Sequence, residues 1–123
     1  MKILVTQQAF ILIVEDDKGR REIPLGDAVY SIYSIGTDPQ SDIRLFSQFV
    51  SKRHATLVWR HHEDGSVYYI IVDGNLKGKL SVQGLLINGQ KLQCLLINGQ
   101  KLQIHHLENE DEIVFDPGVM ATY

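Results

Sequence analysis

Four consecutive residues offer the most chemistry in this sequence: Ser51, Lys52, Arg53 and His54. The serine offers a hydroxyl donor, and the lysine and the arginine offer cationic donors. A phosphate dianion presents three strong acceptor oxygens, so this combination suits an anion of that kind. The surrounding pattern places these residues in a loop between strands, where binding residues usually lie. We therefore expect an anion site in loops at strand ends.

Other kinds of site are poorly supported. Ser51 and His54 lack a third orienting group and a nucleophile-elbow pattern, so the sequence does not predict an enzyme. The pairs His61-His62 and His105-His106 are poor chelates because adjacent residues of a strand point to opposite faces. With no cysteine nearby, we interpret them as surface histidines and expect no metal. No glycine-rich nucleotide loop is present, and no cofactor is expected.

The composition is that of one globular domain over residues 1–123, with 44% hydrophobic residues and a net charge of −3. This charge argues against nucleic acid as the main partner. No apolar run approaches the roughly 18 residues of a membrane span, and Met1 to Gln8 does not resemble a signal peptide. The single cysteine, Cys94, cannot form an intrachain disulfide, which fits a reducing, cytoplasmic setting.

The elements that must position the anion site have the two-residue period of strands, as in Ala55 to Arg60. Asp64-Gly65 is a strong hairpin signal, and no segment sustains a 3.6-residue period. We expect an all-β sandwich or barrel with almost no helix, in which 112–115 forms the closing strand. The other expected strands cover residues 10–14, 20–25, 29–35, 55–60 and 67–72.

A nine-residue segment, LLINGQKLQ, occurs at Leu85 to Gln93 and again at Leu95 to Gln103. Each copy contains Asn-Gly between apolar arms, which predicts a type I′ hairpin turn. The ten-residue shift is even, so the inward and outward alternation stays in phase. Two arrangements remain open: a meander over 84–87, 90–97 and 100–104, or one copy extruded as a loop. An exposed copy is expected to pair with its own sheet or with a second molecule as a homodimer.

Several motifs occur in an order that resembles the forkhead-associated (FHA) domain family. Ile35-Gly36-Thr37 is followed by Asp42 to Leu45, by Ser51 to Ala55, and later by Ser81 to Gly89. The resemblance covers about Arg21 to Phe115. It implies an FHA-type sandwich of two antiparallel sheets, with the duplicated hairpin inserted near residues 85–103. It also implies an interaction module in kinase signalling that binds a phosphothreonine-containing protein through loops at one end, with no nucleic acid or membrane as partner.

The resemblance also assigns roles to single residues. It implies that Ser51 bonds the phosphate, that Lys52 contacts it, and that Arg53 is a second basic residue. Gly36 matches a structural glycine, and His54 matches a histidine that braces the loops. These residues form the candidate phosphopeptide site and its support.

Three positions depart from the family pattern. Thr37 stands where an arginine binds the phosphate, Val82 where a threonine often helps, and Gln83 where an asparagine grips the peptide. Thr37 and Gln83 stay candidate contacts, and Gly84 a supporting residue. Losing the arginine removes roughly 1.5–3 kcal/mol, about ten- to a hundredfold in affinity. The sequence thus predicts a weakened phosphate site, with a phosphate-independent interaction, scaffold or dimerisation module as the alternative.

Overall fold

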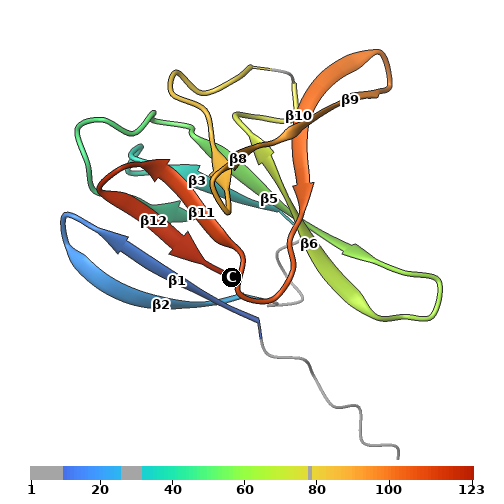
Figure 1. The fold of residues 1–123 in the computed structure, drawn as a ribbon, viewed down its shortest axis with the longest axis horizontal. Coiled ribbons are helices and arrows are strands. Elements are labelled where there is room, and N and C mark those ends of the chain that lie inside the picture. The colour runs from blue at the N-terminus through green and yellow to red at the C-terminus, as the bar shows by residue number, and fades with distance from the viewer. Residues whose placement is uncertain (1–9, 26–31, 78) are drawn as a thin grey trace, which may run out of the picture.

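The computed structural model describes residues 10–25, 32–77 and 79–123, and these residues form strands and no helix. Part of the expected strand at 29–35, namely 29–31, lies outside the described residues. Twelve strands follow one another along the chain (Figure 1): β1 Phe10–Asp16, β2 Gly19–Leu25, β3 Ile32–Gly36, β4 Ile43–Arg44, β5 Ala55–His61, β6 Val67–Asp73, β7 Leu86–Ile87, β8 Gln90–Lys91, β9 Gln93–Ile97, β10 Gln100–His106, β11 Glu112–Asp116 and β12 Val119–Thr122.

The strands form two six-stranded sheets, ordered β2-β1-β12-β11-β7-β8 and β4-β3-β5-β6-β10-β9. Figure 1 shows them as separate layers of a sandwich, which confirms the expected all-β class. One strand pair differs from the expected antiparallel pattern, because β3 and β4 run parallel. The Asp42 carboxylate holds this short bridge by accepting hydrogen bonds from the Ser34 backbone N–H (2.8 Å) and hydroxyl (3.1 Å).

The core lies between the two sheets and is filled by alternating side chains. In β11, Ile113 and Phe115 are fully buried, whereas Glu112 faces solvent. Leu57 and Ile71 cover the core from the opposite sheet. Burying each such side chain contributes about 1.5–3 kcal/mol, so this alternation fixes which face of each strand turns inward.

The closing strand of the fold is β12, so the interpretation that 112–115 closes it is wrong. Pro117 and Gly118 form a tight turn after β11, and the chain returns as β12 between β11 and β1. Val119 and Ala121 are 1% exposed. Four residues are a short stretch for a periodicity argument, yet here they complete the centre of a sheet.

Each copy of the duplicated segment forms its own hairpin. The first copy gives β7 and β8, and the second gives Leu95 to Ile97 of β9 and Gln100 to Gln103 of β10. Both Asn-Gly turns have positive φ at both residues, 52° and 81° in the first copy and 51° and 79° in the second. This geometry confirms the predicted type I′ turns.

The two hairpins belong to different sheets, which neither open arrangement anticipated. The expected continuous strand 90–97 is divided at Leu92, whose partly buried side chain packs against the core. The residues before Leu92 extend one sheet, and those after it extend the other. The leading arm of the first copy pairs with β11, and Ile104 to His106, directly after the second copy, pair with β6, while the chain between them forms two sheet edges.

Candidate anion-binding site

A hollow of about 430 Å³ lies among three chain segments that follow or precede strand ends. The link between β4 and β5 provides one wall, the segment between β6 and β7 provides the other, and the link between β3 and β4 adds Asp38. Because β5 and β6 are antiparallel neighbours with Ala55 opposite Asp73, the start of β5 and the end of β6 lie side by side. The two links that form the walls therefore lie at the same end of these strands. The lining residues are Asp38, Ser51, Lys52, Arg53, Asn75, Lys79, Leu80, Ser81 and Val82.

Ser51 joins the two walls of this hollow. Its Oγ accepts a hydrogen bond from the Val82 backbone N–H at 3.1 Å. A serine hydroxyl that accepts one bond still has its own hydrogen to donate. Ser51 is therefore held in place and keeps a donor available for an oxyanion.

Thr37 is tied to the back of the same loop. Its backbone N–H donates to the Ser51 carbonyl (3.2 Å), and its Oγ1 donates to the Val50 carbonyl (3.3 Å). The neighbouring Asp38 N–H donates to the Lys52 carbonyl at 3.2 Å. The Thr37 hydroxyl thus serves the loop backbone, and Thr37 is not among the lining residues.

Gly36 permits this close contact between loop and strand. A Cβ at this position would lie 2.0 Å from the Lys52 carbonyl oxygen and 3.0 Å from that of Ser51. Contacts under 3.0 Å with backbone atoms cannot be relieved by turning a side chain. Glycine is therefore required for the Ser51 loop to lie against β3.

His54 braces both walls from beneath and is fully buried. Its Nδ1 accepts the Ser51 backbone N–H at 3.1 Å, which places the ring proton on Nε2. Nε2 lies 2.7 Å from the Gly84 carbonyl oxygen and donates to it. Burial is the largest cause that lowers the pKa of His54, although the bond to Gly84 and the charges of Asp73 and Asp116 act the other way. The neutral ring is the form that fits.

The second wall is ordered by a chain of side-chain bonds. The buried Asp73 accepts the Ser81 backbone N–H at 3.0 Å, and the Ser81 hydroxyl accepts the Gly84 N–H at 2.8 Å. Gly84 has φ +79°, a conformation that favours glycine. These bonds hold Val82 where its backbone reaches Ser51.

The hollow carries a local excess of positive charge in an acidic chain. Lys52, Arg53 and Lys79 contribute three cations, and Asp38 contributes one carboxylate. That carboxylate accepts the Gln40 backbone N–H at 2.9 Å. An anion bound here meets a net attractive charge, partly screened by salt because the basic side chains are exposed.

The structure brings some of the predicted residues together and leaves others apart. Ser51, Lys52 and Arg53 line the hollow, whereas Thr37 and the exposed Gln83 do not. The sequence reading missed Lys79 and Asn75. Their signal was the glycine-rich segment directly after β6, since the end of β6 must lie beside the start of its antiparallel partner β5.

The histidine pairs lie away from this hollow. The Tyr68 ring stacks on His62, with ring centroids 4.5 Å apart, and makes a tilted contact with His106 at 4.1 Å. His105 Nε2 lies 2.9 Å from an Asp111 carboxylate oxygen. Within the described ranges, no group of three or more His, Cys, Asp or Glu residues could hold a metal ion.

The described part of the chain also has no helix of the length and hydropathy that a bilayer crossing requires.

The sequence model of the FHA domain family matches residues 33–116, which include every residue that lines the hollow. The chain belongs to the FHA domain family. FHA domains are interaction modules, generally non-enzymatic, that bind phosphothreonine peptides in signalling. The hollow in this FHA domain is lined by Ser51, Lys52 and Arg53, three of the residues proposed from the sequence as phosphopeptide contacts.

Known relatives agree with this assignment. The crystal structure of the Slr1951 protein from Synechocystis sp. is 43% identical, has a TM-score of 0.76, and covers 92% of this chain and 94% of its own. The yeast Dun1 FHA domain, solved with a doubly phosphorylated peptide derived from Rad53, shares the fold with a TM-score of 0.62 at 17% identity, over 99% of this chain and 82% of its own.

A longer relative is the Synechocystis sp. protein sll1895, which is 34% identical over 79 residues. The match covers 64% of this chain, and the chain spans only 11% of that protein.

Proposed function

We propose that this FHA domain recognises a phosphothreonine in a partner protein through the hollow around Ser51. The observation that carries the proposal is the Ser51 hydroxyl, which is fixed by Val82 and flanked by three cations. A phosphate dianion offers three acceptors to these donors. The proposed partner is a phosphoprotein of a serine/threonine-kinase pathway rather than nucleic acid or membrane. The proposed compartment is the reducing cytoplasm.

The affinity is proposed to be weak and sensitive to salt. No arginine stands at position 37, so the charge-assisted fork of the family is missing. Lys52, Arg53 and Lys79 supply point charges instead. Such exposed charges are screened over about 8–10 Å at physiological salt, so binding falls as ionic strength rises.

A second function has its own support in the rim of the hollow. Val82, at a position where the family often has threonine, is 91% exposed, and Leu80 is 47% exposed. These apolar side chains suit a partner bound without phosphate. This alternative is a degenerate FHA domain that acts as a phosphate-independent interaction, scaffold or dimerisation module.

The experiment that separates the two is binding to a degenerate phosphothreonine peptide library, with unphosphorylated and phosphoserine libraries as controls. If the first function is right, phosphothreonine peptides bind clearly more tightly than both controls, and their binding weakens as salt is added. Equal binding of phosphorylated and unphosphorylated peptides favours the second.

Two substitutions then locate the site. Ser51→Ala and Lys79→Ala are expected to weaken phosphopeptide binding by about tenfold each, since each removes a charged-group hydrogen bond worth about 1.5 kcal/mol. Lys77→Ala is the matched control, because Lys77 lies in the same segment and is exposed but does not line the hollow. A phosphopeptide that binds all three variants equally lies elsewhere on the domain.

A further inference from the structure

The four sheet edges of this domain are protected to different degrees. β2 carries three charged residues and Pro24, and β4 and β8 are two residues long and contain Arg44 and Lys91. β9, at the remaining edge, is five residues long, QCLLI, with no charge and no proline. Charges, proline and short length are the usual means by which proteins keep sheet edges from pairing. Among the described strands, β9 is the edge that lacks all of them.

The duplication supplies an internal comparison for this edge. In the first copy, the Leu-Leu-Ile arm pairs with β11, opposite Ile113 and Val114, and Leu85 and Leu86 are 4% and 37% exposed. In the second copy no described strand lies on the outer side of β9, and Leu95 and Leu96 are 42% and 70% exposed. Each of the two leucines is therefore less exposed in the copy that has a partner strand than in the copy that has none.

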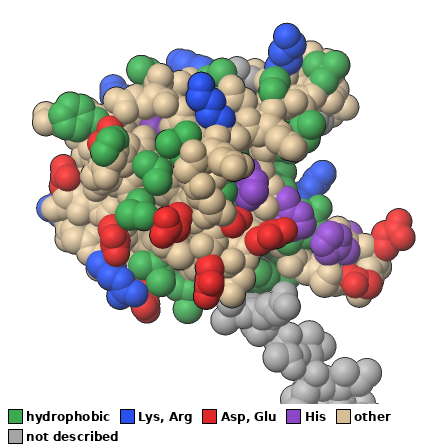
Figure 2. Space-filling view, viewed as in Figure 1, with side chains coloured by type: hydrophobic (Ala, Val, Ile, Leu, Met, Phe, Trp, Pro, Cys, Tyr) green, Lys and Arg blue, Asp and Glu red, His purple; other side chains and the backbone are tan. Residues whose placement is uncertain are grey.

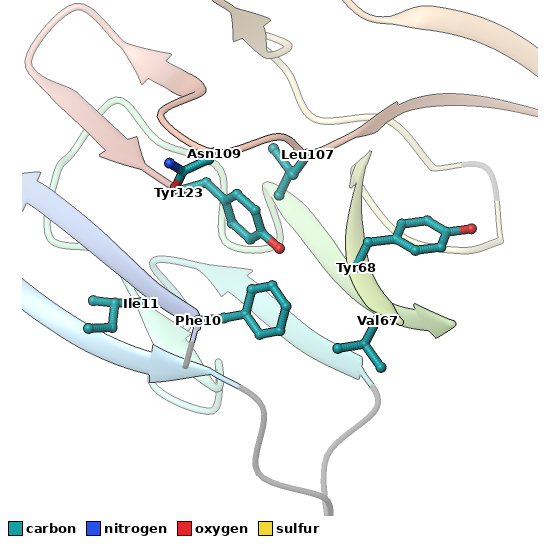
Figure 3. Close-up of a pocket in the computed structure, with 7 residues that line it drawn as sticks. All are labelled: Phe10, Ile11, Val67, Tyr68, Leu107, Asn109 and Tyr123. Atoms are coloured by element: carbon teal, nitrogen blue, oxygen red, sulfur yellow. The ribbon is translucent and has the colours of Figure 1, made fainter. Parts of the chain in front are cut away.

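We propose that β9 pairs antiparallel with β9 of a second copy of this chain, joining two six-stranded sheets into one across a twofold axis. A second copy fits because both edges are then of one kind, long, uncharged and apolar, and an isologous contact satisfies both. The other described edges of the chain do not match, since they are charged or only two residues long. Figure 2 shows hydrophobic side chains on the projecting β9–β10 hairpin, at the upper right.

The register follows from the turn. The Asn98-Gly99 turn is closed by hydrogen bonds between the residues that flank it, Ile97 and Gln100. Counting back along β9 from Ile97, every second residue is therefore hydrogen-bonded to β10. The backbone groups of Cys94 and Leu96 are thereby directed outward. If the two β9 strands overlap along their full length, the twofold axis passes through Leu95. Cys94 of one chain then lies opposite Leu96 of the other chain, and the two Leu95 residues lie opposite each other. A five-residue pairing is smaller than a standard interface, so this dimer forms at high concentration and dissociates on dilution.

The first test is sedimentation velocity on the 123-residue chain from about 10 µM to about 1 mM. The native chain is expected to shift from monomer to dimer. Leu96→Lys is expected to weaken the dimer about tenfold, because it places a charge in the pairing strand of each of the two chains. Leu86→Lys is the matched control: it is the same residue in the first copy, with the same register, and already has its partner strand. Equal effects of the two substitutions, or a native chain that stays monomeric throughout, would overturn the proposal.

The second test checks the register by cross-linking. In the Cys94→Ser background, Leu95→Cys places two thiols opposite each other, with Cβ atoms about 4.5–5.5 Å apart, close to disulfide distance. Under oxidised glutathione this variant is expected to form a covalent dimer. Leu76→Cys in the same background, at a residue 37% exposed elsewhere, is expected to stay monomeric. Equal cross-linking of both variants would refute the β9 pairing. Neither test involves a phosphopeptide, so failure here leaves the proposed peptide function untouched.

Discussion

The imidazole of His54 joins the two loops of the candidate site by accepting the Ser51 backbone N–H at Nδ1 and donating to the Gly84 carbonyl at Nε2. Each bond uses one nitrogen of a neutral ring. Protonation would add a hydrogen to Nδ1 and remove the acceptor for Ser51, in addition to placing a charge in the core. The geometry of the site and the stability of the fold therefore depend on the same proton.

This dependence predicts a loss of stability in mild acid. The folded-state pKa of His54 is lowered below 6.5, chiefly by burial, so the unfolded chain binds the proton more readily than the folded chain. The free energy of unfolding is expected to be highest above pH 6.5 and to fall as the pH drops from 6.5 toward the folded-state pKa. Urea unfolding between pH 7.5 and 5 measures it. His61→Gln, at an exposed position, is the control and should leave this slope unchanged.

Gly36→Ala should destabilise the domain by about 2–3 kcal/mol. The new Cβ would meet the Lys52 carbonyl oxygen at 2.0 Å, so the Ser51 loop must move away from β3. Gly118→Ala is the control: no atom lies within 4 Å of a Cβ there, and a change within about 0.5 kcal/mol is expected. Thermal melts of both variants provide the comparison. Similar melting temperatures would mean that the loop does not depend on this contact.

Thr37→Arg is expected to strengthen phosphothreonine binding by about tenfold or more. The substitution restores the arginine fork that the family has at this position, and gives up only the 3.3 Å hydrogen bond from the Thr37 hydroxyl to Val50. Fluorescence anisotropy with a phosphothreonine peptide measures the gain, and Thr37→Gln controls for side-chain length. An unchanged affinity in a folded Thr37→Arg variant would place the phosphate elsewhere.

Deleting Cys94 to Gln103 should give a folded, monomeric domain that is at least as stable as the parent. Leu85 to Ile87 would keep their place beside β11, and Ile104 to His106 would keep theirs beside β6. Leu92 would then take the buried position of Leu102. Light scattering and urea unfolding test this variant. Failure to fold would show that the second copy is an integral part of the domain.

The sandwich and much of the site were accessible from sequence because their signals are local. Alternation in Ala55 to Arg60 identifies a strand, and the run from Ser51 to His54 identifies the loop before it. The division at Leu92 was not accessible, because both copies carry the same residues and only the neighbouring strands decide which sheet each joins. Lys79 was missed for a related reason: its place in the hollow depends on the pairing of β5 with β6 rather than on any adjacent motif.

The identity of the two copies has a consequence for how the chain folds. Either Leu-Leu-Ile arm can dock on β11, since a shift of ten residues preserves which side chains face inward. In molecules whose second arm docks on β11 first, the first copy is looped out of the sheet. The second arm must then leave β11 before β9 and β10 can form. Refolding is therefore expected to divide into a fast phase and a slower one limited by this exchange, and the single-copy deletion should refold with the fast phase alone.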